Sequence, residues 1–259
     1  MIVETPRARF GVHFAGDGAP GVLALHPLAL SGAVWNEAAD GVAARLGLMG
    51  LDARGHGESS WDGRPFTVQD MADDAAAVIE ATAPGPVGVI GLSMGGSTAL
   101  VLAARRPDLV SRVVIADASA CYGPDRVAEW AERARSAEFK PRAEQLEFQR
   151  DRWFGAAFRE AHEDAVSRVC DIFLRTSGAA HAAACRALGD LDATDQLGKI
   201  TAPALVVVGS EDYAAPPAMA RVIAAGIPGA ELMILEGARH MSLVEQPSAW
   251  ARIEAHLGA

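Results

Sequence analysis

The sequence predicts an α/β fold with a mostly parallel central sheet and helices on both of its faces. Short apolar runs alternate with helical patterns, a serine flanked by glycines follows one of these runs, and one long stretch lacks strand-like runs altogether. Such alternation is typical of parallel sheets, because the chain returns to start each new strand through a helix that packs on the sheet.

Each strand is expected at a short apolar run. These runs are residues 21–26, 46–52, 87–90, 112–117, 203–209 and 231–235, and residues 10–15 add an antiparallel edge strand. Helices are expected between them, at residues 35–45, 67–82, 94–105, 216–225 and 247–257. Thr67 and Asp70 resemble a capping box at the start of one helix, and Pro107 follows the end of another, where a helix breaker belongs.

The alternation is interrupted between Asp117 and Leu205, where no strand-like run occurs. This stretch predicts a helical cap of residues 119–195, inserted into a core of residues 1–118 and 196–259 that forms a single domain with it. Its aromatic side chains are expected mainly to pack the cap onto the core; they are Trp130, Phe139, Phe148, Trp153, Phe154, Phe158 and Phe173. Trp130, Trp153 and Arg133 are the side chains expected to bind substrate.

Composition excludes several classes of protein. The 259 residues carry a net charge of −10 and no run of basic residues, which disfavours nucleic-acid binding. No apolar run approaches the roughly 18 residues of a membrane span, and residues 1–11 lack the apolar core of a secretory signal. We expect a cytoplasmic protein that acts on a small molecule, with homo-oligomerisation left open. Cys121, Cys170 and Cys185 are expected to be reduced, buried thiols.

The motif G-L-S-M-G-G at residues 91–96 is the most informative stretch. A valine-rich run enters it and an Ala/Leu-rich helical pattern leaves it. In that context G-x-S-x-G is a nucleophile elbow, a turn so sharp that only very small residues fit two positions on either side of the serine. The motif predicts Ser93 as the nucleophile, its hydroxyl held clear of the backbone.

A serine nucleophile needs a base within hydrogen-bond reach and an acid that orients the base. His240 follows the last predicted strand and Asp212 follows the strand before it, so both are expected at the carboxyl edge of the sheet, where ligands bind in open α/β folds. The chain order Ser, Asp, His is the one that this elbow predicts. His26 stays open as an alternative base, and Asp117 as an alternative acid.

The other histidines are expected to have no part in the chemistry. His13 is assigned to an early strand, His56 to the turn-forming motif D-x-R-G-H-G-x-S at residues 52–59, and His162, His181 and His256 to the surface.

An oxyanion hole needs two backbone N–H donors. Met94, directly after the nucleophile, supplies one, and because Pro27 has no N–H, Leu28 is expected to supply the other.

With these residues placed, the whole chain resembles the α/β-hydrolase superfamily, and within it the 3-oxoadipate enol-lactonase group. The narrower likeness is carried by residues 91–96, 152–154, 158–159, 185–192 and 208–217, and by His240 followed by E-Q-P at residues 245–247. The resemblance implies hydrolysis of a carboxylic ester or lactone through an acyl-enzyme. A substrate like 3-oxoadipate enol-lactone would need a cation for its carboxylate, and Arg126, Arg133 and Arg152 are the candidates. No metal-ligand set or nucleotide loop is recognisable, so neither a metal nor a cofactor is expected.

The chain departs from that group at two places where a substrate would sit. Residues 181–185 read H-A-A-A-C where the group often carries a tyrosine and paired cysteines, and the loop at residues 26–30 contains no glycine. Other chemistries with the same triad therefore stay open: hydrolysis of a carbon–carbon bond, of a homoserine lactone or a carboxyl ester, and perhydrolysis. A ligand-binding receptor on this fold is the non-enzymatic alternative, against which the intact triad argues.

Overall fold

The computed structural model describes residues 1–39 and 41–258, and over these residues an 8-stranded sheet runs in the order β1-β2-β4-β3-β5-β6-β7-β8. The pairs from β4 to β8 are all parallel, and only β1–β2 and β2–β4 are antiparallel. The strands are β1 (Ile2–Glu4), β2 (Arg9–Phe14), β3 (Val22–Leu25), β4 (Leu48–Leu51), β5 (Val87–Leu92), β6 (Val110–Ala116), β7 (Ala204–Gly209) and β8 (Glu231–Leu235). The predicted fold class is confirmed.

Strand β2 corresponds to the antiparallel strand expected at the edge, but it is not the edge strand. β1 pairs outside it, with Ile2 opposite Gly11. The sequence did not predict β1, because three residues are too few for an alternating pattern to stand out.

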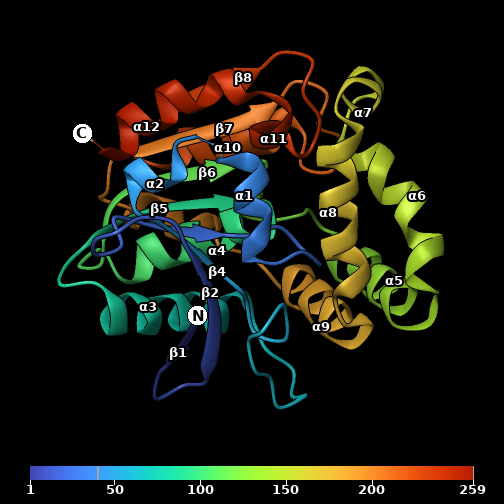
Figure 1. Cartoon of the computed structure of the whole chain (residues 1–259), viewed down its shortest axis with the longest axis horizontal. Helices are drawn as coiled ribbons and strands as arrows, with labels where there is room; N and C mark the ends of the chain where they lie inside the picture. The colour runs from blue at the N-terminus through green and yellow to red at the C-terminus, as the bar shows by residue number, and fades with distance from the viewer. Residues whose placement is uncertain (40, 259) are drawn as a thin grey trace.

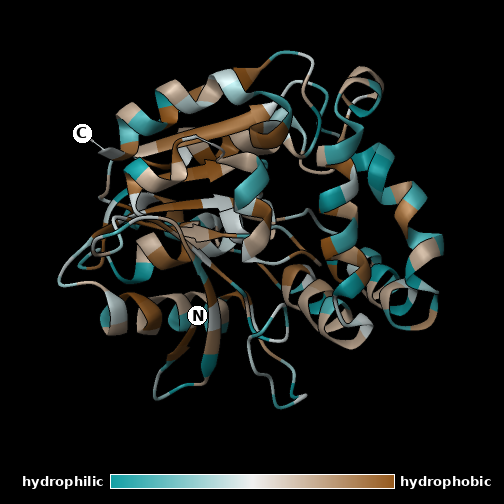
Figure 2. Cartoon of the chain, in the orientation of Figure 1, coloured by the Kyte–Doolittle hydropathy of each residue, from teal (hydrophilic) through white to brown (hydrophobic). Residues whose placement is uncertain are grey.

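Helices cover both faces of the sheet (Figure 1). One face carries α3 (Val68–Thr82), α4 (Met94–Arg105) and α10 (Pro217–Gly226), and the other carries α1 (Trp35–Ala38), α2 (Ala43–Leu46) and α12 (Trp250–Gly258). Val89 and Ile90, adjacent on β5, belong to different apolar clusters, because successive strand residues point to opposite faces. The central strands are accordingly hydrophobic along their length (Figure 2).

The single helix expected at residues 35–45 is wrong. The chain forms α1 and α2 instead, and Gly41 between them has a φ of 77°, a left-handed conformation through which an α-helix does not continue. Short elements complete the described chain: α11 (Ser242–Glu245) and the 3-10 turns η1 (Gly32–Val34), η2 (Thr194–Lys199) and η3 (Pro247–Ala249), the last leading into α12.

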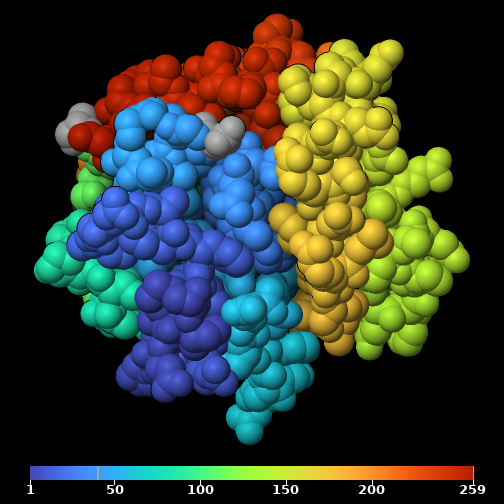
Figure 3. Space-filling view, viewed as in Figure 1, coloured from blue at the N-terminus to red at the C-terminus, as the bar shows by residue number. Residues whose placement is uncertain are grey.

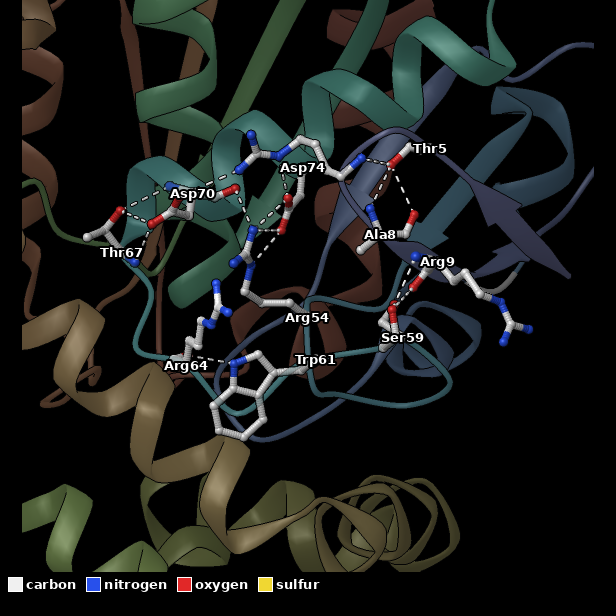
Figure 4. Close-up of polar contacts among 12 residues, drawn as sticks. Thr5, Ala8, Arg9, Arg54, Ser59, Trp61, Arg64, Thr67, Asp70 and Asp74 are labelled. Carbon is white, nitrogen blue, oxygen red and sulfur yellow. Dashed lines mark hydrogen bonds and ion pairs between the residues drawn. The ribbon is translucent and has the colours of Figure 1, made fainter.

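The predicted capping box at the start of α3 is confirmed. Thr67 Oγ1 accepts a hydrogen bond from Asp70 N at 3.1 Å, and Thr67 N donates to Asp70 Oδ2 at 2.9 Å (Figure 4). One turn further along, the buried Asp74 accepts two hydrogen bonds from Arg54, at 2.6 and 2.7 Å (Figure 4). This pair anchors the loop at residues 52–59 to the helix.

The same loop supports the segment that follows β3. Asp52 accepts hydrogen bonds from Gly32 N at 2.7 Å and from Glu58 N at 2.9 Å, and Ser59 Oγ donates to Asp52 O at 2.6 Å. A Cβ atom on Gly57 would lie 2.1 Å from Asp52 Oδ2, so only glycine fits there. The motif at residues 52–59 thus shapes a turn and fixes the start of the neighbouring loop.

Consecutive helices occupy the stretch where the cap was expected, and they lie together beside the carboxyl ends of the parallel strands (Figure 1). They are α5 (Arg126–Phe139), α6 (Arg142–Trp153), α7 (Ala156–Ala161), α8 (Glu163–Arg175) and α9 (Gly178–Gly189). In the space-filling view α8 packs directly against the region around α1, where Arg168 pairs with Glu37 (Figure 3). The limits of the cap at residues 119 and 195 stay a prediction.

Several side chains of this region lie elsewhere than expected. Trp130, Trp153, Phe154 and Phe173 are buried, whereas Phe139 and Phe148 are exposed and do not pack the helices onto the core. Cys170 and Cys185 are buried free thiols, but Cys121, in the loop that leaves β6, is only half-buried. Within residues 1–39 and 41–258 no helix combines the length and apolar character needed to cross a bilayer.

Candidate active site

The turn between β5 and α4 is as tight as the sequence predicts. Ser93 sits at its apex with φ of 56° and ψ of −115° and donates its N–H to Ala116 O at 2.8 Å. A Cβ on Gly91 would lie 2.1 Å from Gly95 O, and a Cβ on Gly95 would lie 2.0 Å from Leu25 O. Both positions require glycine, and the turn brings the start of α4 against the loop that follows β3.

Three side chains from separate loops form one hydrogen-bonded chain at the carboxyl edge of the sheet. His240 Nε2 lies 2.8 Å from Ser93 Oγ, and His240 Nδ1 lies 2.8 Å from Asp212 Oδ2. A carboxylate can only accept, so His240 Nδ1–H donates to Asp212 and Nε2 is left to accept from the Ser93 hydroxyl. Asp212 Oδ1 accepts from the N–H groups of Ala214 and Ala215 at 2.7 and 3.0 Å, which fixes the carboxylate.

The alternative base, His26, is engaged elsewhere. Its Nδ1 lies 2.8 Å from Pro27 O and its Nε2 accepts from Ala53 N at 2.9 Å, so both ring nitrogens are used by the backbone. Burial lowers the pKa of His26, in keeping with a neutral ring. His26 thus braces the loop after β3 and makes no hydrogen bond to Ser93.

The alternative acid, Asp117, is buried beside Asp212 but does not bond to the imidazole. Its carboxylate accepts from Gly209 N at 3.0 Å, from Ser242 N at 3.2 Å and from Ser242 Oγ at 2.6 Å. Burial and the negative charge of Asp212 raise the pKa of Asp117 well above its ordinary value. These contacts tie the loops after β6, β7 and β8 together beneath the hydrogen-bonded chain.

The two residues predicted to form an oxyanion hole lie close to the serine. Met94 begins α4 directly after Ser93, and Leu28 borders the same cavity as the Ser93 side chain. Within the described chain, neither backbone N–H donates to a protein acceptor. The loop that carries Leu28 is strained, because Ala29 adopts a φ of 61° that favours glycine.

A cavity opens above Ser93 and His240, and side chains of α5 and α6 form part of its wall. The side chains predicted to bind substrate, Trp130, Trp153 and Arg133, all line it. Other lining side chains lay outside that prediction, among them Tyr122, Gln149, Arg152 and His181. Of these, Arg152 had been considered only as a candidate cation. Tyr122 lies in a loop, and its ring is 4.9 Å from that of Trp130. No sequence pattern marks Tyr122 as a cavity residue.

Two of the candidate cations face this cavity and the third does not. The Arg133 guanidinium lies 4.1 Å from the centre of the Trp130 ring, and Arg152 lies 5.7 Å from the ring of Tyr213. Neither arginine has a carboxylate partner among the described residues. Arg126 instead donates to Gly123 O and pairs with Asp192 at 3.6 Å, outside the cavity. Burial, reinforced by the charge of Arg133, lowers the pKa of Arg152 to about 10.

The expectation of a surface position is wrong for two histidines. His181 is 4% exposed and lines the cavity, and His256 is buried with Nε2 3.2 Å from Val113 O. The run of alanines around His181, residues 179–184, indicates a helix buried on nearly all sides, and that pattern could have located it. His162 is exposed, as expected.

Comparison with known proteins gives a consistent result. The model of the "Alpha/beta hydrolase family" matches residues 22–253. The chain is 30% identical over 199 residues to 3-oxoadipate enol-lactonase 2 of Acinetobacter baylyi, covering 77% of this chain and 73% of that protein. It is 28% identical over 234 residues to (E)-2-((N-methylformamido)methylene)succinate hydrolase of the same species, covering 90% and 87% of the two chains.

A solved structure agrees with these relatives. The enol-lactonase from Burkholderia xenovorans LB400 is 27% identical and matches with a TM-score of 0.90 over 98% of each chain. The resemblance that the sequence motifs suggested is therefore confirmed. With a family model that spans most of its length and a shared fold, this chain belongs to the alpha/beta hydrolase family of enzymes.

Proposed function

We propose that this enzyme hydrolyses a carboxylic ester or lactone that carries a carboxylate, and that an enol-lactone like 3-oxoadipate enol-lactone is its preferred substrate. One observation carries the proposal: the hydrogen-bonded chain of Ser93, His240 and Asp212 opens into a cavity that holds two arginines without carboxylate partners among the described residues. The named activities of the enol-lactonase and succinate-hydrolase relatives support an acidic substrate.

In the first half of the reaction, Ser93 Oγ attacks the substrate carbonyl while His240 Nε2 takes its proton. Asp212 holds the imidazole in the accepting tautomer and stabilises the imidazolium that forms. The N–H groups of Leu28 and Met94 donate to the oxyanion, each contributing about 3 kcal/mol to transition-state stabilisation. When this intermediate collapses, the bond to the leaving oxygen breaks and that oxygen takes the proton from His240, which leaves an acyl-enzyme on Ser93 and a neutral imidazole.

In the second half, His240 removes a proton from water, which attacks the acyl-enzyme and releases the acid. With an enol-lactone, ring opening expels an enol oxygen that tautomerises to a ketone. Such a leaving group needs less protonation than an alkoxide, which suits a site whose acid is a single histidine.

The arginines explain the preference for an anion. A guanidinium that is partly withdrawn from water loses hydration energy, and a substrate carboxylate restores a partner for that charge. Arg133 and Arg152 lie on α5 and α6, and the rings of Trp130 and Trp153 line the same cavity with apolar surface. We therefore treat residues 119–195 as a cap that determines the substrate, set on a core that determines the chemistry.

The test compares kcat/KM for 3-oxoadipate enol-lactone, for a neutral lactone and for 4-nitrophenyl acetate. We expect a strong preference for the anionic lactone, and a reduction of that preference by about 10- to 100-fold in Arg133→Met or Arg152→Met, since a hydrogen bond to a charged group contributes about 1.5–3 kcal/mol. Equal values for the anionic and the neutral lactone would refute the proposed substrate. Ester cleavage that survives in Ser93→Ala would refute the mechanism.

A further inference from the structure

His181 is a buried polar side chain for which the proposed mechanism has no use. It lies on α9, is 4% exposed, and borders the cavity that contains Ser93 and His240. It also borders an outer pocket lined mainly by α5 and α6, together with Arg133 and Gln149. Neither Ser93 nor His240 lines that outer pocket, so His181 lies where the cavity of the serine meets the outer pocket.

The tautomer of His181 follows from a single contact. Arg142 Nη1 lies 2.7 Å from His181 Nδ1. A guanidinium can only donate, so Nδ1 must accept, and the proton of the neutral ring must sit on Nε2. Burial and the positive charge of Arg142 lower the pKa of His181 well below its ordinary value, which keeps the ring neutral.

Arg142 is itself firmly held. Its Nη2 donates to Phe173 O at 2.6 Å, and its guanidinium lies 3.6 Å from the centre of the Phe173 ring. The Phe173 ring also meets His181 edge-on, with ring centres 6.0 Å apart. These contacts fix the direction from which Arg142 approaches the histidine, and thereby the orientation of the imidazole.

The charged and titratable groups near His181 and Arg142 favour the neutral form of the His181 ring. Arg133 and His56 face His181 from α5 and from the loop after β4, and Cys185, on the same helix as His181, faces Arg142. The positive charges of Arg142 and Arg133 disfavour protonation of the imidazole to its cationic form. Burial raises the pKa of Cys185 to about 11, so it adds no negative charge.

The Nε2–H of His181 is left without an acceptor among the described residues, on a side chain that borders the cavity. We propose that His181 is a substrate-binding residue whose Nε2–H donates to an oxygen of the substrate carboxylate beside Arg133, and that Arg142 is the positioning residue that fixes the donating tautomer. This inference rests on the proposed function, because it requires an anionic acyl group. Arg133 supplies the charge, and His181 supplies a neutral, directional donor.

The first experiment measures selectivity between two esters with the same leaving group and acyl length, mono-4-nitrophenyl adipate and 4-nitrophenyl hexanoate. We expect His181→Phe, which keeps a ring against Phe173, to lower the adipate-to-hexanoate ratio of kcat/KM by about 10- to 100-fold, mainly through KM. His181→Gln, which places an amide N–H near the position of Nε2, should restore part of the ratio. His162→Gln, at an exposed histidine of the same helical region, is the matched control and should keep the wild-type ratio.

The second experiment reads the tautomer directly by long-range ¹H–¹⁵N NMR. We expect His181 to be protonated on Nε2 and its pKa to lie below that of an ordinary histidine. Arg142→Met should populate the other tautomer and lower the adipate-to-hexanoate ratio, whereas Arg142→Lys, which retains a donor, should restore both. A purely structural role for Arg142 would leave the nitrogen resonances of His181 unchanged.

The outcomes separate the two proposals. A wild-type enzyme that does not distinguish the two esters refutes both the anionic substrate and the role of His181. A wild-type enzyme that prefers the adipate ester, with the preference intact in His181→Phe, refutes the role of His181 alone. Protonation of Nδ1 in the wild-type spectrum refutes the tautomer and with it the positioning role of Arg142. Thermal unfolding of every variant shows that the fold is retained.

Discussion

Asp117 and Asp212 follow neighbouring strands of the sheet, yet only Asp212 bonds to the imidazole of His240. Asp117 accepts its hydrogen bonds from Gly209 and Ser242 instead. The two carboxyl groups therefore make separate contacts: Asp212 holds the imidazole of His240, and Asp117 ties together the loops that surround it.

Asp212→Asn is expected to lower kcat by about 10⁴-fold with little loss of structure. The amide oxygen can keep the N–H groups of Ala214 and Ala215, which turns the amide NH₂ toward His240 Nδ1. Nδ1 must then accept, so the ring proton moves to Nε2 and the base can no longer receive the Ser93 proton. Steady-state ester hydrolysis measures the effect, and a loss below about tenfold would assign the orienting role elsewhere.

Asp117→Asn is the matched variant and should show the opposite pattern. All of its partners can donate, so an NH₂ group in place of one oxygen faces a backbone N–H, and the free energy of unfolding should fall by about 1–3 kcal/mol. We expect kcat to fall far less than in Asp212→Asn. Urea unfolding and ester hydrolysis, measured on the same samples, separate the two effects.

The backbone of Ser93 stores strain that substitution can reveal. At φ of 56° and ψ of −115° a residue with a Cβ is strained by about 1–3 kcal/mol, whereas glycine is not. Both Ser93→Ala and Ser93→Gly remove the proposed nucleophile, but only the glycine variant relieves the strain. We expect Ser93→Gly to be more stable than Ser93→Ala by about 1 kcal/mol in urea unfolding, net of the greater flexibility of glycine in the unfolded chain. Equal stabilities would mean that the elbow is unstrained.

Gly95→Ala should disrupt the oxyanion loop. The added methyl would lie 2.0 Å from Leu25 O and 2.9 Å from His26 O, both backbone atoms, so α4 and the loop after β3 must separate. A displacement of about 1 Å at the site costs on the order of 10²-fold in kcat. Gly85→Ala is the control, because a Cβ there meets no atom within 4 Å, and it should leave kcat unchanged.

The buried histidines predict how stability changes with pH. Burial lowers the pKa of His56 to about 3 from an ordinary value of 6.5, and it lowers the pKa of His26 and His181 too. Between about pH 3 and 6.5, His56 binds a proton in the unfolded chain but not in the folded chain. The contribution of His56 to stability is therefore complete above pH 6.5 and falls with acidification by about 1.4 kcal/mol per pH unit, and the lowered pKa values of His26 and His181 act in the same direction.

Urea unfolding at several pH values between about 5 and 8 tests this dependence, since the free energy of unfolding should decline below the ordinary histidine pKa. His56→Phe removes one titrating ring and should reduce the slope by about one proton equivalent. His162→Gln, at an exposed site, should leave the slope as it is. An unchanged slope in His56→Phe would show that His56 does not titrate differently in the two states.

Local sequence patterns predicted most of the fold. The apolar runs located β3 to β8, because a strand buried on both faces is hydrophobic along its length. Predictions were wrong where a local signal was too short or too weak: β1 has only three residues, and the break between α1 and α2 depends on the conformation of one glycine. Phe139 and Phe148 were expected to be buried because hydrophobicity alone does not say which face of a helix meets the core.

By itself, the sequence determined the class of the molecule, through the alternation of strands and helices and through glycines that must flank Ser93 for the turn to close. Those are local constraints, set by sterics and by burial within a few residues. Only the tertiary structure decided which acid reaches His240, that Arg133 and Arg152 face one cavity while Arg126 does not, and that His181 lies inside. These contacts are between residues far apart in the sequence, on loops after different strands and on helices of the insertion. Strand order and helix packing determine them, so no local sequence pattern could predict them.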